Sequence, residues 1–327
     1  MALTIERCDT VTHGEEIKAL FLRNDYPTFP AFFRRAYPYA MSTGGASWVA
    51  RNGQGSVVGH LAAFPRVFGD GTRVARGALL VDNLFDRAYR NYWSAVELSR
   101  RALADIREAG DYDFAYTDPS LPGQALLRAL GFTRVGTLQR FVFPLHPLYA
   151  GFFRIKARAQ PLAAEPVGGL QDPRVAEALR ALPPGPQFRG ERSVELYATR
   201  LGGDTMPDWQ WLLLRPQRQA GAAVAALVLT APQPGAAVLR IVDLLWDDAR
   251  VSPASVVHAV ARTARDVGFT KLSMVTLAES ELARSLGRCG FIRRHDALPL
   301  VVHLTRTNAA LPPVRDWALT YFDGSGW

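Results

Sequence analysis

The sequence has few of the residues that would mark several common classes of protein. Its two cysteines, Cys8 and Cys289, are too few for a disulfide framework. Cys8 lies near the start of an expected strand and Cys289 at the end of an apolar helix, so we interpret both as small buried side chains rather than nucleophiles. No apolar run reaches the roughly 18 residues that a membrane helix needs, and residues 1–4 lack the basic and then apolar pattern of a signal peptide. These absences favour a cytoplasmic protein that does not act at a membrane.

Lysine is also scarce, since Lys18, Lys156 and Lys271 are the only lysines in a chain of net charge +8. We attribute the excess of arginine to a GC-rich genome and not to function. The charges are scattered, without the block of like charges found in nucleic-acid-binding tails. They are compatible with an anionic ligand, but no nucleic-acid-binding motif accompanies them. The six histidines have no metal-ligand spacing. We therefore expect neither a nucleic-acid partner nor a metal site.

The sequence does contain a repeat. The segment Val81–Asp86 recurs as Val242–Asp247, and the pair Gly131-Phe132 recurs as Gly290-Phe291. Asp243 follows Asp82 by 161 positions and Gly290 follows Gly131 by 159, so the spacing within each copy is kept. A repeat at a fixed interval indicates duplicated architecture. Since 327 residues suffice for two domains with cores of their own, we predict domains at 1–150 and 151–327.

Hydrophobic periodicity gives the two halves the same order of elements. In the first half we expect one or two helices within 14–36, strands at 47–51, 56–68 and 72–85, a helix at 92–109, a strand at 114–117, a helix at 119–130 and a strand from 140. In the second half we expect a helix at 191–201, strands at 209–214, 222–230 and 238–246, a helix at 253–267, a strand at 271–276, a helix at 279–289 and a strand at 298–304. Residues 144–173 are rich in proline, glycine and alanine, which predicts an irregular crossover. The aromatic tail from 312 should pack against the body.

This order, together with motifs in the first half, resembles the GNAT superfamily of acyl-CoA N-acyltransferases. Leu84–Arg90 looks like that family's passage from strand to helix. Arg90 and Ala95 fit the first and last positions of its Q/R-x-x-G-x-G/A loop, and Leu126–Phe132 looks like its late helix with the closing Gly-Phe. The resemblance implies an α+β fold of two tandem GNAT-like domains. Each would be a mixed, mostly antiparallel sheet flanked by helices.

The resemblance also implies an activity, in which an acyl group passes from acetyl-CoA or another acyl-CoA to the amine of a small molecule. A helix N-terminus binds phosphate through free N–H groups and its dipole, so the start of the helix at 92–109 should hold the diphosphate. The residues implied to hold the co-substrate are Asn83, Phe85, Arg90, Asn91, Tyr92, Trp93, Ser94 and Ala95. Asp82 stands where many relatives carry a glutamate and would act as the general base. The usual acidic tyrosine is replaced by Leu127, so Tyr116 is the alternative acid.

Several departures from the family pattern leave a second interpretation open. Trp93 stands at the middle glycine of the loop, where an indole would fill the phosphate space unless it turned away. Arg250–Ser255, the corresponding segment of the second half, contains no glycine, so that copy is predicted to have lost coenzyme A binding. Asp82 is either a base or a structural carboxylate, because Asp243 repeats it, and Tyr116 is either an acid or a core residue. The chain is thus an acyltransferase with its site in the first half, or a non-catalytic protein of this fold that binds a ligand or partner.

Overall fold

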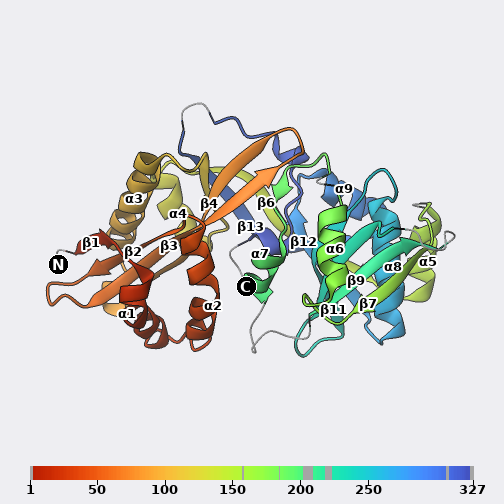
Figure 1. Ribbon diagram of the computed structural model, residues 1–327, viewed down its shortest axis with the longest axis horizontal. Coiled ribbons are helices and arrows are strands. Elements are labelled where there is room, and N and C mark those ends of the chain that lie inside the picture. The colour runs from red at the N-terminus through yellow and green to blue at the C-terminus, as the bar shows by residue number, and fades with distance from the viewer. Residues whose placement is uncertain are drawn as a thin grey trace.

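The computed structural model describes residues 3–156, 158–183, 185–201, 209–217, 223–306 and 309–324. They form two lobes side by side, with helices on both faces of the sheet (Figure 1). The first half contains β1 (Thr4–Arg7), α1 (Thr10–Leu22), α2 (Phe29–Ser42), β2 (Ala46–Arg51), β3 (Val57–Gly69), β4 (Val74–Phe85), α3 (Tyr92–Ala109), β5 (Phe114–Thr117), α4 (Leu121–Ala129) and β6 (Thr133–Pro144). The second half contains α5 (Pro147–Lys156), β7 (Leu162–Val167), α6 (Pro173–Ala181), β8 (Arg189–Gly190), α7 (Val194–Leu201), β9 (Gln210–Pro216), β10 (Ala226–Pro232), β11 (Val238–Trp246), α8 (Pro253–Asp266), β12 (Lys271–Leu277), α9 (Glu281–Arg288) and β13 (Ile292–Leu304).

Local sequence explains the helices that frame the central strands. In α3, Asn91 caps the first turn by accepting a hydrogen bond from the N–H of Ser94, and Gly110 ends the helix with φ 67°. In α8, Ser252 caps the N–H of Ser255 in the same way. The expected bounds of α3 and of the strands β5 and β11 are confirmed. The order of elements from β4 to α4 recurs from β11 to α9, as the repeat predicted.

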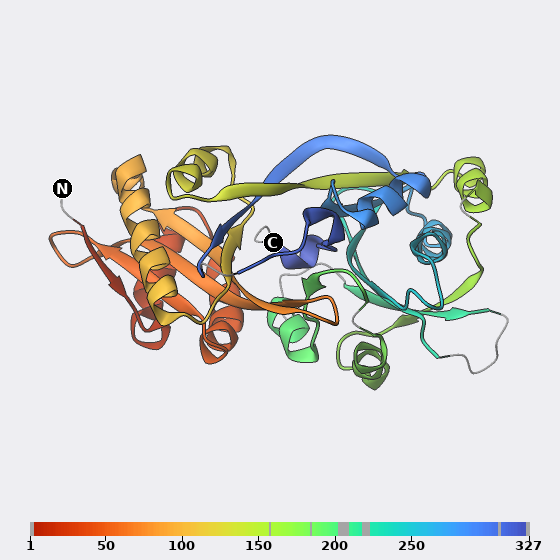
Figure 2. The same cartoon turned by 90° about the horizontal axis from the view of Figure 1, so that it is seen from above.

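The strands of both halves join one continuous sheet and exchange places at its centre. The order is β1-β2-β3-β4-β5-β13-β6-β12-β11-β10-β9-β7, with β8 paired to β3. β13, the last strand of the chain, lies between β5 and β6, and β6 of the first half pairs with β12 of the second. Both long strands run across the junction between the lobes (Figure 2). The division at residue 150 remains a prediction, and that residue lies inside α5.

The expectation of an irregular crossover at 144–173 was wrong, because the segment holds α5 and β7. The periodicity of β7 is weak because it is an edge strand that pairs only with β9 among the described strands and contains Pro166, which suits an edge. β13 also begins at Ile292 and not at 298. Its first seven residues are exposed, so no buried face marks them in the sequence.

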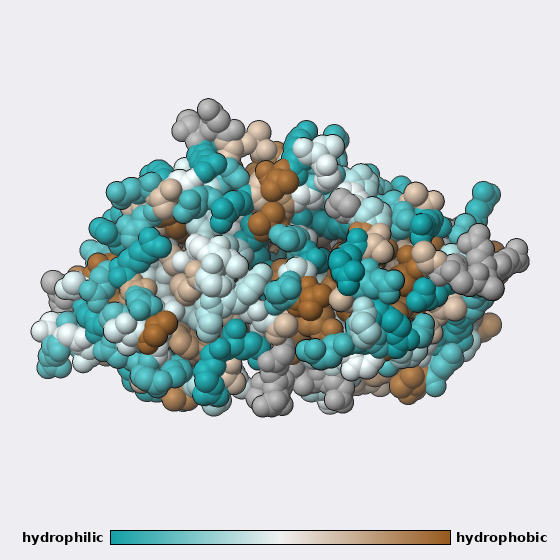
Figure 3. Space-filling view, in the orientation of Figure 1, coloured by the Kyte–Doolittle hydropathy of each residue, from teal (hydrophilic) through white to brown (hydrophobic). Residues whose placement is uncertain are grey.

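The C-terminal tail packs back on the body, as expected. Trp317 is 2% exposed and Phe322 is fully buried. Both cysteines are buried too. On the face shown in Figure 3, hydrophilic side chains predominate and apolar ones gather in separate patches. Within the described ranges, no helix combines the length and apolar character that would let it cross a membrane.

Candidate active site

The central strand of the first half, β4, separates from its neighbour on one side and bulges on the other. β4 pairs in parallel with β5 only from Gly77 to Leu79, although β4 continues to Phe85. On its other side the register with β3 shifts, so that Asp82 and Asn83 both lie opposite Leu61. Such a β-bulge leaves one residue unpaired and redirects its side chain. Asp82 has φ 58°, in the left-handed region, and strained backbone of this kind gathers at functional sites.

A cleft of about 650 Å³ opens where β4 and β5 separate, between the end of β4 and the helices α3 and α4. Six of the residues predicted to hold the co-substrate line it: Asn83, Phe85, Arg90, Asn91, Tyr92 and Ala95. Ser94 does not line the cleft and is buried. Trp93 does not line it either, because its indole turns outward, is 71% exposed and packs edge-on against Tyr92. The expected obstacle to phosphate therefore lies outside the cleft.

The start of α3 offers this cleft a limited set of donors. Asn91 accepts from the N–H of Ser94 at 3.0 Å, and Ala95 donates to the carbonyl of Asn91. Among the described residues, no group accepts a hydrogen bond from the N–H of Tyr92 or of Trp93. Arg90 lies beside them and donates Nη2 to the carbonyl of Phe85 and to Asn24, both at 3.1 Å. Two free N–H groups, the positive end of a helix and an arginine suit an anionic group such as phosphate.

The carboxylate of Asp82 lies on the opposite face of the sheet from α3. The hydroxyl of Tyr37 in α2 donates to its Oδ2 at 2.6 Å. Burial raises the pKa of Asp82 to about 6, although the hydrogen bond from Tyr37 acts in the opposite direction. A carboxylate with such a pKa is ionised at neutral pH, yet it accepts a proton more readily than an ordinary aspartate.

A buried polar chain beneath Asp82 holds the bulge. His60 is fully buried and pairs with Leu84, next to the bulge. It contacts the carbonyl of Asp82 through Nδ1 at 3.2 Å and Ser47 through Nε2 at 2.9 Å. Since a carbonyl only accepts, Nδ1 carries the proton, and Ser47 must donate to Nε2. Ser47 in turn accepts from the thiol of Cys8. Burial lowers the pKa of His60 to about 4, so the imidazole stays neutral. No motif in the sequence pointed to this histidine.

A second, smaller cavity of about 50 Å³ lies on the Asp82 side of the sheet. Its walls come from α2, β3, β4 and, from the second half, α7. Arg35 fixes α7 against α2 by donating Nε to the carbonyl of Thr199 at 2.8 Å. Val81 and Asp82 line both this cavity and the larger cleft. Asp82 thus stands at the boundary between two spaces, one on each face of the sheet.

The structure places Tyr116 away from both spaces. Its side chain is 1% exposed and donates to the carbonyl of Asp323 at 3.2 Å, and burial raises its pKa. It lines neither the cleft nor the cavity, so its surroundings are those of a core tyrosine. Leu127 does line the cleft, and the position that carries an acid in the family pattern is therefore apolar here.

The second half repeats the aspartate in a closed environment. Tyr197, which follows Tyr37 by 160 positions, donates to Asp243 as Tyr37 does to Asp82. Here Arg192 adds an ion pair to Asp243 at 2.5 Å and Thr320 adds a hydrogen bond at 2.8 Å. Burial acts to raise the pKa of Asp243, but Arg192 and these hydrogen bonds hold that pKa below the usual range. The paired tyrosines were detectable from the interval of the repeat.

The tail fills the space that stays open in the first half. β11 and β12 pair only as far as Ile241 and Met274. Beyond that point Thr320 forms a β-bridge with Thr276, whose hydroxyl donates to the carbonyl of Leu319 at 2.6 Å. The region between the ends of β11 and β12 is therefore occupied by the chain itself.

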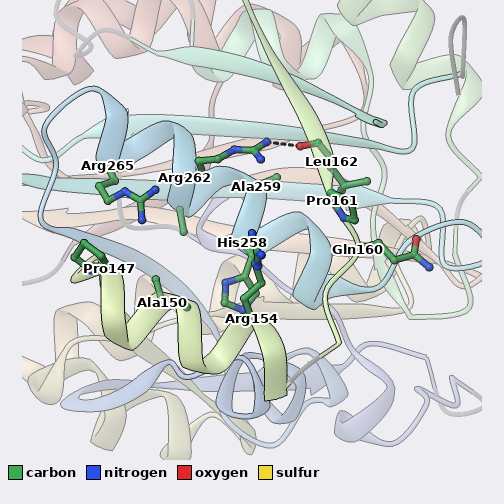
Figure 4. A pocket seen from close by; sticks show the side chains of 12 residues that line it. Pro147, Ala150, Arg154, Gln160, Pro161, Leu162, His258, Ala259, Arg262 and Arg265 are labelled. Atoms are coloured by element: carbon green, nitrogen blue, oxygen red, sulfur yellow. Dashed lines mark hydrogen bonds between the residues drawn. The ribbon is translucent and has the colours of Figure 1, made fainter. Parts of the chain in front are cut away.

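A further crevice of about 110 Å³ lies between α5 and α8 (Figure 4). Arg154, Arg262, Arg265 and His258 line it, and Arg262 donates to the carbonyl of Leu162, which also lines it. It shares no lining residue with the two spaces at Asp82, so it is not part of that site. Across the described ranges, histidine, cysteine and acidic side chains form no group of three or more that could hold a metal ion.

Comparison with solved structures identifies the fold. No protein-family model and no curated protein matches the sequence. The structure is similar to a GCN5-related N-acetyltransferase from Anabaena variabilis, with a TM-score of 0.69 and 14% identity, covering 93% of this chain and 73% of that one. A probable N-acyltransferase of unknown function from Enterococcus faecalis gives a TM-score of 0.68 at 11% identity, with coverage of 94% and 74%. Saccharomyces cerevisiae N-myristoyltransferase with bound myristoyl-CoA gives 0.54 at 9%, with coverage of 96% and 87%.

These identities are low, so the similarity concerns the fold. The chain has the fold of the GCN5-related N-acetyltransferases.

Proposed function

We propose that the chain is an N-acyltransferase that moves an acetyl or other acyl group from acyl-CoA to the amine of a small molecule. The observation that carries this proposal is the position of Asp82, which borders the cleft on one face of the sheet and the cavity on the other. Acyl-CoA would occupy the cleft, with its diphosphate near Arg90 and the free N–H groups of Tyr92 and Trp93. The amine would approach from the cavity. The two reactants then meet at the bulge.

The reaction follows from this arrangement. The amine nitrogen attacks the thioester carbonyl, the C–N bond forms, and the C–S bond breaks with release of coenzyme A as the thiolate. The proton of the amine passes to the carboxylate of Asp82. A backbone N–H at the bulge would stabilise the oxyanion that forms between these steps. Tyr116 has no part in this scheme, because its hydroxyl is committed to Asp323.

The second half would not bind a co-substrate of its own. The tail occupies the space between β11 and β12, and Pro253 removes one N–H from the start of α8. Its contribution to the site would be α7, which forms one wall of the acceptor cavity. We therefore assign a single active site, in the first half.

The alternative is a non-catalytic protein that binds a ligand in the same cleft. Two observations favour it: Asn91 uses its own side chain to cap α3, and Leu127 replaces the usual acid. Two measurements separate the possibilities. The first is the thermal midpoint with and without coenzyme A, which binding should raise. The second is thiol release from acetyl-CoA and longer acyl-CoAs with a panel of amines. If coenzyme A leaves the thermal midpoint unchanged and thiol release does not exceed the background hydrolysis of acyl-CoA, the proposal of an enzyme is refuted.

A further inference from the structure

A buried arginine in the acceptor cavity has no acidic partner among the residues that the structure describes. Arg66 lies on β3 opposite Gly77, where β3 extends toward the second half and pairs with β8. Its side chain is only 7% exposed, yet it lines the same cavity as Asp82. Charged side chains are seldom buried to this extent unless they are paired. Arg66 therefore needs an explanation that ordinary packing does not supply.

The contacts of the Arg66 guanidinium compensate only part of its positive charge. Nη2 donates to the carbonyl of Phe322 at 3.3 Å, and the group lies 5.5 Å from the centre of that ring. No carboxylate in the described ranges forms an ion pair with it. Asp323 is near enough to act on its charge, but that carboxylate is bound by Arg192 and by the N–H of Thr320. Burial lowers the pKa of Arg66, as expected for a cation whose solvation has been replaced incompletely.

Three charged side chains of the described residues line the cavity: Asp82, Arg66 and Arg200. Arg200 donates to the carbonyls of Phe322 and Gly324, and Phe32, Phe64 and Leu79 give the cavity apolar walls. Asp82 is the only acidic residue among the described residues of the lining, and it is the residue that the acceptor amine would approach in the proposed reaction. A ligand that carries an ammonium group toward Asp82 and an anionic group toward Arg66 would complement both ends. The planar guanidinium suits a carboxylate in particular, because it can donate two parallel hydrogen bonds.

We propose that the acceptor is an amino acid or a similar small amine with a carboxylate, and that Arg66 binds this carboxylate while the amine faces Asp82. The assignment rests on the proposed function and specifies its substrate class. The cavity of about 50 Å³ has room for a group of a few atoms, such as a carboxylate. Arg66 would then determine specificity without taking part in the chemical step.

The test uses matched amines that differ only in the carboxylate: phenylalanine with phenethylamine, lysine with 1,5-diaminopentane, and 4-aminobutyrate with propylamine. Thiol release from acetyl-CoA gives kcat/KM for each, and ligand-observed NMR gives binding without turnover. Wild type should prefer the acid of at least one pair by about 10- to 100-fold, the range for hydrogen bonds to a charged group. Arg66→Met should remove this preference and leave the amine without the carboxylate unaffected. Arg73→Met, on the exposed turn of the same hairpin, is the matched control and should keep it.

The outcomes separate this assignment from the proposed function. If wild type acylates or binds the amines without a carboxylate as well as it does the acids, the role of Arg66 is refuted while the acyltransferase stands. The same holds if Arg66→Met keeps the full preference. The wild-type comparison needs no variant, so misfolding of Arg66→Met does not prevent a decision. If no acyl-CoA is turned over, the NMR comparison of acids with their matched amines still decides whether Arg66 recognises a carboxylate.

Discussion

Replacing Asp82 with asparagine should stabilise the protein at neutral pH while it impairs acyl transfer. The reason is the pKa of Asp82, which burial raises to about 6 from an ordinary value of 3.8. Between these two values the folded chain binds a proton that the unfolded chain releases. Stability that depends on this group is therefore present at acid pH and is lost as the pH rises through this window. Asparagine keeps the shape of the protonated form and has no charge to bury.

The magnitude follows from the two pKa values. The change from 3.8 to about 6 corresponds to about 3 kcal/mol once Asp82 is fully ionised, since a change of one in pKa is worth about 1.36 kcal/mol. Between pH 4.5 and pH 7.5 the part that changes is about 2 kcal/mol, because the unfolded carboxyl is already mostly ionised at the lower pH. The free energy of unfolding of Asp82→Asn minus that of wild type should increase by this amount over the interval. Taking the difference cancels the titration of all other groups that the substitution leaves undisturbed.

Urea unfolding followed by tryptophan fluorescence at the two pH values measures this quantity, and Asp243→Asn supplies the contrast. Arg192 and hydrogen bonds hold the pKa of Asp243 below its ordinary value, so its ionised form stabilises the fold above the unfolded pKa. Asp243→Asn should therefore destabilise the protein at neutral pH, by about 3–5 kcal/mol for a broken buried ion pair, and less at acid pH. A difference for Asp82→Asn that does not change with pH would refute the reasoning about burial at the bulge.

Three further results are expected. Asp82→Asn should lower the rate of acyl transfer by roughly 10²- to 10⁴-fold with little change in the Kd of coenzyme A, while Asp243→Asn, if folded, should leave turnover nearly intact; equal rates in all three proteins would make Asp82 structural. For wild type, kcat/KM plotted against pH should rise through about 6 as Asp82 ionises, and a profile flat from pH 5 to 7 would contradict this. Calorimetry should show that Arg90→Ala weakens coenzyme A binding by about 1.5–3 kcal/mol. Arg250→Ala and Trp93→Ala should change this affinity little, because Arg250 lies in the second half and the indole of Trp93 points outward. A large loss of affinity in either control would contradict the assigned position of the site.

The sequence predicted much of the fold because its main signals are local. The amphipathic pattern of α3, the asparagine before it and the glycine after it lie within one continuous segment, and the predicted bounds agree with the structure. The interval between Asp82 and Asp243 predicted the duplication. Local signals do not predict the exchange of β13 and β6, because nothing in the sequence of either strand specifies which of two similar sheets it joins. That choice depends on pairing across more than 100 residues.

The candidate site was predictable in part for the same reason. The cleft residues at the end of β4 and the start of α3 are neighbours in sequence, so the family motif located most of them. The bulge, the hydrogen bond from Tyr37 to Asp82 and the support from His60 depend on contacts between distant segments. Trp93 shows the limit of a motif, because the motif gives the residue at a position but not the direction of its side chain. Tyr116 shows it too, since only the packed tail reveals the partner of its hydroxyl.

The two copies of the aspartate-tyrosine pair indicate how one duplicated architecture can serve two purposes. In both halves a tyrosine from the helix before the strands binds the aspartate of the central strand. In the second copy, Arg192 and Thr320 bind Asp243 and the tail covers it. The charge of Asp243 therefore stabilises the fold. In the described part of the chain, Asp82 of the first copy has no such arginine or threonine partner, and its pKa stays raised beside two open spaces. Because α7 of the second half also forms a wall of the acceptor cavity, the stabilised copy would hold in place the surface on which the other copy recognises its substrate. The strand exchange joins the two copies, since β13 and β6 pair strands of one half with strands of the other at the centre of the sheet.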